Sequence, residues 1–342
     1  MDVNNLDDKI ESNSPIEILN IPDFSVVIPL YNKSESIVQT LDSVLNQSYQ
    51  SFEIIIVDDE STDNSVNIIE NRYNDPRIKI ISQENQGEYG ARNTGILNSQ
   101  AKAIAFLDGD DEWGRDYLEE IHTLMQHYPE AGLYCTAYSQ IQDGKNNERY
   151  AFGFQENDRG IMQSPLKNFV IDRVNPMSCS NAVIPRMVFQ QIGMFAPTRG
   201  SGWDWEMWVR VILNYPIAYS AKNLVKINIC GDNRLSNVPQ NMQLDEHPVI
   251  IYLDSLNENE LSASVSLPEL ILFRDYINVV FADMWITTGG DGQFIRKILT
   301  RINNKNIFKK EIIYGYVQSF TPIFLRGYIY YIAKRVQNIM SK

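Results

Sequence analysis

The sequence has few cysteines and no long apolar run, and both shortages narrow what the chain can be. Cys135, Cys179 and Cys230 are widely spaced, so they form neither a disulfide framework nor a CxxC zinc pair, and we expect a reducing compartment. The best candidate for a membrane-spanning segment, residues 312–325, is shorter than the roughly 18–20 apolar residues required. Residues 1–22 are acidic and lack the basic start of a secretory signal, so we expect a disordered tail there.

Two glycine-rich nucleotide-binding motifs are also missing. No GxGxxG follows any predicted strand, which argues against a dinucleotide oxidoreductase. A sugar nucleotidyltransferase carries a Gly-rich phosphate loop after its first strand, whereas residues 29–33 contain no glycine. The net charge of −13 argues against nucleic acid as a partner.

Charge is distributed unevenly along the chain. Residues 293–342 contain ten Lys or Arg and one acidic residue, interleaved with Ile, Phe and Tyr. Such a segment either lies on an anionic membrane surface or forms a helical appendage with a solvated basic face. With the reducing compartment expected above, we expect a cytoplasmic protein. If the basic segment lies on a membrane, the protein would be peripheral at its inner face.

Strand and helix signals alternate through the first 135 or so residues. Short β-branched runs predict strands, and segments with one apolar face predict helices. The predicted strands cover 24–28 (ended by Pro29), 52–57, 78–82 and 103–107. The first predicted helix is capped by Ser34, and its apolar face consists of Ile37, Val38, Leu41, Val44 and Leu45. Two more helices are predicted over 63–73 and 87–99. This order predicts an α/β fold with a mostly parallel, Rossmann-like sheet, helices on both faces, and ligands at the carboxyl ends of the strands.

The rest of the chain is less regular. We expect a loop or hairpin over 142–158, a strand over 181–185, and helices over 186–192 and 203–213. Residues 265–342 are predicted to be mainly helical.

Three groups of acidic residues stand out. They are residues 58–60, residues 108–111, and Asp204 with Glu206. Crowded carboxylates at a strand end need a cation or hydrogen-bond donors nearby. Gly109 permits a turn that presents Asp108 and Asp110 on one side, and such oxygens suit Mg²⁺ or Mn²⁺ bound to phosphates. Each group taken alone is more often a turn, a helix cap or a core segment.

In combination, the motifs resemble the family 2 glycosyltransferases, which are inverting enzymes of the GT-A fold. The matching segments occur in the family's order and are 25–32 (SVVIPLYN), 41–47 (LDSVLNQ), 57–63 (VDDESTD), 85–93 (NQGEYGARN), 107–111 (LDGDD), 193–195 (GMF) and 204–208 (DWEMW). The resemblance implies an inverting glycosyltransferase of hexosyltransferase type, acting in polysaccharide or lipid-linked glycan synthesis for the cell envelope.

The resemblance also implies a donor site for a nucleotide-sugar. Pro29 and Tyr31 correspond to a base-binding ledge, because a Tyr ring can stack on a base. Asp59 corresponds to the residue that reads a uracil-like edge, which favours a UDP-sugar. Arg92 corresponds to a contact with the nucleotide or diphosphate, and its fork suits phosphate oxygens.

Asp108 corresponds to the residue near the ribose and the metal, and Asp110 to the direct metal ligand. Asp111 is expected to orient either one. The bound Mg²⁺ or Mn²⁺ would neutralise the departing diphosphate.

Asp204 corresponds to the family's general base, which accepts the proton of the acceptor hydroxyl. Trp203 and Trp205 flank it and can offer ring faces to a glycan or lipid-linked acceptor. Glu206 is the less suitable base, because it lies two positions after Asp204 and its side chain would point to a different side of the helix.

Three positions depart from the family pattern. Glu60 replaces a glycine, and Trp203 replaces an acid. Cys230 occupies the place of a metal-binding His, and a thiol is a poor ligand for Mg²⁺. Three alternatives stay open: the metal has one protein ligand fewer, Asp232 or Asn233 replaces the His, or the alignment of this segment with the family differs. These departures keep open a non-catalytic relative that binds nucleotide-sugars or glycans.

The predicted organisation is a GT-A domain over 23–240, with a nucleotide-binding half at about 23–135 and an acceptor half at about 136–240. A mainly helical region with a basic aromatic end follows over 241–342.

Overall fold

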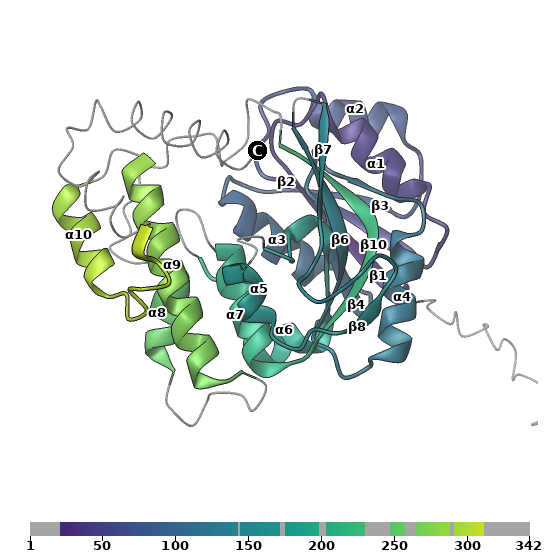
Figure 1. The fold of residues 1–342 in the computed structure, drawn as a ribbon. Helices are drawn as coiled ribbons and strands as arrows, with labels where there is room; N and C mark the ends of the chain where they lie inside the picture. The colour runs from purple at the N-terminus through teal and green to yellow at the C-terminus, as the bar shows by residue number, and fades with distance from the viewer. Residues whose placement is uncertain are drawn as a thin grey trace, which may run out of the picture.

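A mixed β-sheet with helices on both faces forms the centre of the protein (Figure 1). The computed structural model describes residues 21–142, 144–171, 175–197, 203–229, 247–256, 265–287 and 291–310. Within these residues the sheet has 10 strands, and its main path has the order β3-β2-β1-β4-β9-β6-β10-β5. The predicted acidic tail up to residue 20, Cys230 with its neighbours, and the basic end from residue 311 lie outside the described residues.

The first half of the sheet is parallel, as predicted. Its strands are β1 (Phe24–Leu30), β2 (Phe52–Asp58), β3 (Ile78–Ser82) and β4 (Ala103–Phe106). The helices between them are α1 (Ile37–Leu45), α2 (Ser65–Arg72) and α3 (Gly87–Asn98). Because β1 lies between β2 and β4, the chain reverses its direction across the sheet at β1. Loops diverge at such a point and leave a crevice at the carboxyl ends of the strands.

Side chains of the parallel strands alternate between two hydrophobic layers. Val27 and Phe106 face the layer that contains α3, whereas Val26 and Ile54 face the layer that contains α1 and α2. A strand covered on both faces requires nearly continuous apolar sequence, which is why the strand signals were clear.

Antiparallel pairs appear in the second half of the sheet. Its strands are β5 (Glu112–Trp113), β6 (Leu133–Gln142), β7 (Lys145–Arg149), β8 (Arg159–Ile161), β9 (Ala182–Pro185) and β10 (Ile217–Asn228). Its helices are α4 (Tyr117–His127), α5 (Pro165–Ile171), a 3-10 turn (Cys179–Asn181), α6 (Arg186–Ile192) and α7 (Trp203–Asn214). The fold class is confirmed, and so is the hairpin, which β6 and β7 form. Beyond β4 the sheet is mixed, because β9 runs antiparallel to both β4 and β6.

Three C-terminal helices pack against this second half. They are α8 (Pro248–Ser255), α9 (Leu267–Thr287) and α10 (Gly292–Thr300). They share one hydrophobic core with α5 and α7, and the rings of Phe169 and Phe273 lie 5.3 Å apart at this contact. In the part of the chain that the structure describes, no helix is both long and apolar enough to cross a membrane.

The first strand runs two residues further than predicted, through Pro29. Its length follows from which side each backbone group faces. The Val27 carbonyl accepts the N–H of Leu107, beyond β4, and the Leu30 carbonyl accepts the N–H of Asp59, beyond β2. Backbone groups alternate sides along a strand, so Pro29 turns its nitrogen toward β4, whose pairing has already ended at Val27. The missing N–H therefore removes no hydrogen bond from the ladder.

The prediction that Ser34 caps the first helix is wrong. Helix α1 has Ser36 at its N-cap position, and the Lys33 carbonyl accepts the N–H groups of Ser36 and Ile37. The Ser34 N–H donates instead to the Asp63 carboxylate at 2.9 Å. Ser34 thus joins two loops rather than capping the helix.

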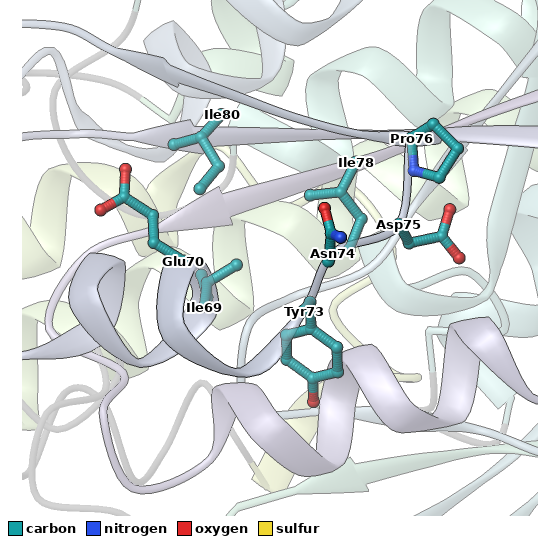
Figure 2. Close-up of a pocket in the computed structure, with 8 residues that line it drawn as sticks. All are labelled: Ile69, Glu70, Tyr73, Asn74, Asp75, Pro76, Ile78 and Ile80. Atoms are coloured by element: carbon teal, nitrogen blue, oxygen red, sulfur yellow. The ribbon is translucent and has the colours of Figure 1, made fainter.

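An open hollow of about 520 Å³ lies between α2 and β3 (Figure 2). Its lining residues are Ile69, Glu70, Tyr73, Asn74, Asp75, Pro76, Ile78 and Ile80. Most of them precede or begin β3, so the hollow belongs to the amino-terminal end of this strand. The acidic residues that follow β2 and β4 lie at the opposite, carboxyl end of the strands.

Gly95 determines how closely α3 approaches β1, and we predict that Gly95→Ala destabilises the protein. An added Cβ would lie 2.3 Å from Cγ1 of Val27, so helix or strand must shift. We expect the free energy of unfolding to fall by about 1–3 kcal/mol, as for other overpacked cores. Denaturant titration measures it. The control is Leu97→Ala on the same helix, where the side chain is 69% exposed, and equal stability of the two variants would contradict the prediction.

Candidate functional site

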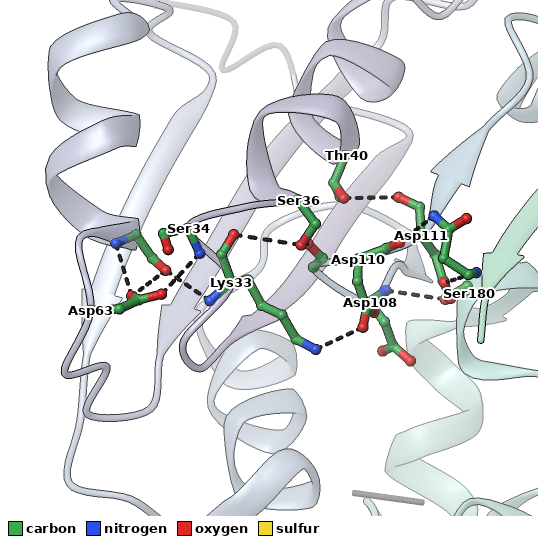
Figure 3. A network of polar contacts seen from close by, with 12 residues as sticks. Lys33, Ser34, Ser36, Thr40, Asp63, Asp108, Asp110, Asp111 and Ser180 are labelled. Carbon is green, nitrogen blue, oxygen red and sulfur yellow. Dashed lines mark hydrogen bonds and ion pairs between the residues drawn. The ribbon is translucent and has the colours of Figure 1, made fainter. Parts of the chain in front are cut away.

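Three loops at the carboxyl ends of β1, β2 and β4 are tied together by polar contacts (Figure 3). The Asp63 N–H donates to Oδ1 of Asn32 at 3.2 Å, and the Ser34 N–H donates to the Asp63 carboxylate at 2.9 Å. Ser36 Oγ donates to the Gly109 carbonyl at 2.8 Å. Since these contacts bridge segments far apart in sequence, the loops form one connected surface at the sheet edge.

Pro29 and Tyr31 lie at the end of β1, where the base-binding ledge is expected. Pro29 is half-buried and Tyr31 is 48% exposed. An exposed tyrosine offers both a ring face and a hydroxyl to a ligand. Their position agrees with a ledge, and contact with a base stays a prediction.

Asp59 lies at the same edge but is almost fully buried, with 3% exposure. Its carboxylate accepts hydrogen bonds from Nε2 of Gln83 at 2.7 Å, from the N–H of Gln86 at 2.9 Å and from the N–H of Gly87 at 2.8 Å. These contacts hold the start of α3 against the β2 loop. They use three of the roughly four acceptor positions of a carboxylate, so any base contact would use what remains.

Glu60 adopts the backbone conformation that the family's glycine would favour. Its φ is 68°, in the left-handed region, where a residue with a Cβ is strained. Its carboxylate accepts the N–H of Asn85 at 3.3 Å. The replacement of glycine by Glu60 therefore keeps a glycine-like turn after Asp59 and adds a carboxylate to it.

Asp111 fixes the loop after β4 from the inside. Its side chain is buried, and its carboxylate accepts hydrogen bonds from Ser180 Oγ at 2.5 Å and from the Asn228 N–H at 2.9 Å. Its carbonyl accepts the hydroxyl of Thr40 at 2.9 Å. Because Asp111 points inward, the neighbouring Asp108 and Asp110 are the residues that this loop presents at the sheet edge.

Each of these two carboxylates contacts a basic side chain. Asp108 pairs with Arg92, and Oδ2 of Asp110 lies 2.7 Å from Nζ of Lys33. The side chains of Asp108 and Asp110 remain 27% and 17% exposed. Lys33 was not among the residues that the sequence singled out.

Arg92 is fully buried, so it is not the surface residue that a position on a helix normally implies. It pairs with Asp108 and with Glu88, whose Oε2 lies 3.2 Å from Nη1 one helical turn earlier. Burial alone lowers the pKa of Arg92, but the Asp108 and Glu88 carboxylates raise it above its ordinary value. Sequence reasoning missed Glu88, although its spacing of four residues from Arg92 was the available signal.

Asp204 lies half-buried in the first turn of α7. Burial raises the pKa of its carboxyl to about 6, while the nearby Arg92 charge lowers this pKa and the Glu88 charge raises it. The predicted base is therefore influenced by the charges of two residues on α3, Arg92 and Glu88.

Glu206 is held elsewhere, as its position along the helix predicts. Its Oε2 accepts a hydrogen bond from Nη2 of Arg210 at 2.8 Å, and both residues are buried. Arg210 also donates to the carbonyls of Ile192 and Met194, at 2.7 and 2.8 Å. Glu206 thus supports the start of the segment that precedes α7, which leaves Asp204 as the candidate base of this group.

Trp205 packs among the C-terminal helices. Its ring stacks on Tyr276 at a centroid distance of 6.4 Å and meets Phe169 edge-on at 5.3 Å. Acceptor binding by Trp205 stays a prediction, and these contacts occupy part of the ring surface that it would use. The side chain of Trp203 lies outside the described part of the structure.

The acidic residues of the β4 loop can supply two ligands to a divalent cation. Among the described residues, no group of three or more His, Cys, Asp or Glu side chains could hold a metal ion. Mg²⁺ commonly binds through one or two carboxylates together with water and substrate phosphates. The partly exposed oxygens of Asp108 and Asp110 fit that mode. Cys230, Asp232 and Asn233 lie outside the described residues.

Residues 25–193 match the family described as Glycosyl transferase family 2. The chain is 33% identical over 202 residues to the putative teichuronic acid biosynthesis glycosyltransferase TuaG of Bacillus subtilis, which covers 58% of this chain and 75% of that protein. The chain belongs to glycosyl transferase family 2. The matched residues contain every predicted donor-site residue from Pro29 to Asp110, whereas Asp204 lies beyond them.

Another relative is the Escherichia coli protein WfgD, a UDP-Glc:alpha-D-GlcNAc-diphosphoundecaprenol beta-1,3-glucosyltransferase. The identity is 39% over 103 residues, which cover 30% of this chain and 40% of WfgD. The chain spans only 31% to 43% of the length of the three Rickettsia glycosyltransferases that it also matches.

The fold as a whole is similar to that of S. aureus TarS, residues 1–349, solved in complex with UDP-GlcNAc. The TM-score is 0.64 at 18% identity, and the match covers 91% of this chain and 92% of that one. This similarity extends the shared fold through the C-terminal helices, beyond the segment that the family match covers.

We predict that Glu60→Gly is more stable than Glu60→Ala by about 1 kcal/mol, because only glycine adopts a φ of 68° without strain. Both variants remove the carboxylate that accepts the Asn85 N–H, so their difference isolates the backbone. Thermal or denaturant unfolding of the pair measures it. An alanine variant as stable as the glycine variant would show that this turn relaxes to another conformation.

Proposed function

We propose that the chain is an inverting glycosyltransferase that transfers a sugar from a UDP-sugar to an acceptor hydroxyl. One observation carries the proposal: the buried Arg92 pairs with Asp108 of the acidic loop after β4, and its charge also lowers the pKa of Asp204. The acidic loop offers groups for a diphosphate and its cation, and Asp204 offers a base. Sugar transfer from a nucleotide requires both functions at one place.

The nucleotide is held, in this proposal, at the ends of β1 and β2. Tyr31 presents an exposed ring for a base to stack on, and Asp59 has remaining acceptor capacity beside it. The choice of UDP is supported by the complex of TarS with UDP-GlcNAc and by the UDP-Glc in the name of WfgD.

Asp108 and Asp110 would hold Mg²⁺ or Mn²⁺ against the diphosphate. When bound, the cation neutralises negative charge that develops on the departing diphosphate. Arg92 keeps the Asp108 carboxylate in place from the buried side. The chain thus supplies rigid carboxylates, and rigidity matters because reorganisation during the reaction would raise the barrier.

Asp204 would act as the general base. The acceptor oxygen attacks the anomeric carbon from the face opposite the diphosphate, its proton passes to Asp204, and the bond from that carbon to the diphosphate breaks. A pKa of about 6 leaves the carboxylate ionised at neutral pH, while making it a stronger base than an ordinary aspartate.

The acceptor is proposed to be a growing polysaccharide or a lipid-linked glycan. The names of TuaG and WfgD, which refer to teichuronic acid and to a diphosphoundecaprenol-linked sugar, support these classes. A transfer assay with a free oligosaccharide and a diphospholipid-linked one separates them. Adding anionic vesicles to the same assay tests the membrane contact proposed for residues 293–342.

Nucleotide binding tests the donor site directly. We expect UDP to bind in calorimetry or thermal-shift experiments with Mn²⁺, and to bind more weakly with a chelator, because Asp108 and Asp110 act through the cation. GDP, dTDP and CMP form the comparison panel. If another nucleotide stabilises the protein instead, that nucleotide would replace UDP as the proposed carrier of the donor sugar. No stabilisation by any of them would favour a relative that binds glycans without turnover.

For the base, we predict that Asp204→Asn lowers the transfer rate by about 10²–10⁴ and leaves UDP affinity unchanged, since an amide cannot accept the proton. In the unchanged protein, kcat/KM should fall as the pH drops through about 6, because the carboxyl becomes protonated, and this acid limb should be absent from the variant's residual activity. Asp116→Asn, an exposed aspartate before α4, is the control. Full turnover by Asp204→Asn would remove Asp204 from the mechanism.

A further inference from the structure

Lys33 places a positive charge directly on the carboxylate that is proposed to bind the metal. Its Nζ lies 2.7 Å from Oδ2 of Asp110, and the two side chains are 19% and 17% exposed. Figure 3 shows the side chain of Lys33 reaching from the loop after β1 to the loop after β4. The contact is therefore inside the site, close to solvent, and between two different loops.

The backbone and the stem of Lys33 are held firmly. Its N–H donates to Ser65 Oγ at 2.8 Å, and its carbonyl accepts the N–H of Ile37 at 2.9 Å at the start of α1. Its stem covers Gly109, where an added Cβ would lie 3.2 Å from Cγ of Lys33. The fixed backbone and the stem beside Gly109 keep Lys33 next to the carboxyl end of β4.

The two cations of the β4 loop differ in how easily they can be exchanged. Arg92 is fully buried and pairs with two carboxylates, so removing it from Asp108 would leave its buried charge only partly compensated. Lys33 is partly exposed. Its ammonium is a compact charge, so the geometry of a carboxylate oxygen and that of a phosphate oxygen suit it equally. The Asp110 pair is mostly buried, so it can open at little cost only when each charge gains a new partner, and a cation with a diphosphate would supply both.

We propose that Lys33 is an exchangeable counter-ion. Its ammonium pairs with Asp110 before the donor binds, and it then leaves Asp110 and pairs with a diphosphate oxygen of the incoming nucleotide. This inference rests on the proposed function and adds a positioning residue to it. A divalent cation and Lys33 compete for Asp110, whereas the diphosphate attracts both of them. Cation and nucleotide therefore bind cooperatively, because each relieves the competition that the other meets.

The test measures two affinities in Lys33→Met, which keeps the stem and removes the charge. We expect Mn²⁺ alone, followed by electron paramagnetic resonance, to bind about threefold tighter or more, since its competitor is gone. We expect UDP at saturating Mn²⁺ to bind on the order of tenfold more weakly, since a charged hydrogen bond to the diphosphate is lost. Lys79→Met, an exposed lysine on β3, should change neither affinity.

Two further variants keep the inference open to refutation. In an Asp110→Asn background, Lys33→Met should no longer tighten Mn²⁺ binding, because the competition requires the Asp110 carboxylate. Lys33→Arg, which preserves the charge, should bind Mn²⁺ no tighter than the unchanged protein. Lys33→Gln, which also removes the charge, replaces Lys33→Met if that variant does not fold.

Unchanged or weaker Mn²⁺ binding by Lys33→Met would overturn the exchange, and so would unchanged UDP binding. Either result leaves the proposed function standing if the unchanged protein binds UDP with Mn²⁺. If the unchanged protein does not bind UDP with Mn²⁺, the proposed function and this inference both fail.

Discussion

The buried guanidinium of Arg92 is the constraint around which the site is built. A charge without access to water is tolerated only when carboxylates and hydrogen bonds compensate it. Glu88 on the same helix and Asp108 on the β4 loop supply that compensation, so α3 cannot move away from the strand ends without exposing unpaired charge. Gly95, one helical turn further on, lets α3 lie directly on β1. Backbone packing and charge pairing thus fix the same helix, and the half-buried Asp204 lies within the influence of the same charges.

Around this centre, the loops are ordered by side chains rather than by secondary structure. Asn32 and Glu60 both adopt positive φ values, of 52° and 68°, which residues other than glycine rarely do. Asn32 accepts N–H groups from the β2 loop, and Asp111 accepts a hydroxyl and an N–H behind the β4 loop. Each contact satisfies a group that a loop would otherwise expose to water. Loops organised in this way are ordered before a ligand arrives, which is the arrangement that electrostatic catalysis would use.

The sequence was most informative where burial dictates pattern. Strands covered on both faces need continuous apolar runs, and the parallel half of the sheet was predictable for that reason. The end of β1 was not, because whether Pro29 is tolerated depends on where the pairing with β4 stops. Of the residues that the motifs identified, Pro29, Tyr31, Asp59, Asp108 and Asp110 lie at the strand ends, whereas Trp205 packs among the C-terminal helices. Lys33 and Glu88 were missed because their roles come from pairing: the partner of Lys33 lies 77 residues away, and Glu88 acts through Arg92 on Asp108. Glu60 was recognised as a departure, but only the backbone angle shows that the turn persists.

The C-terminal helices matter to the site through α7. Trp205 follows Asp204 directly and packs against Tyr276 on α9 and His247 before α8. His247 is buried in this contact, and burial lowers its pKa to about 3, so it stays uncharged at neutral pH and keeps the contact apolar. The first turn of α7 is thus anchored by the C-terminal helices. Burial is the main cause of the raised pKa of Asp204, and this residue lies directly beside the contact that fixes α7. The C-terminal helices therefore hold the element that carries the proposed base, and a substitution at this packing contact is expected to act on Asp204 from a distance.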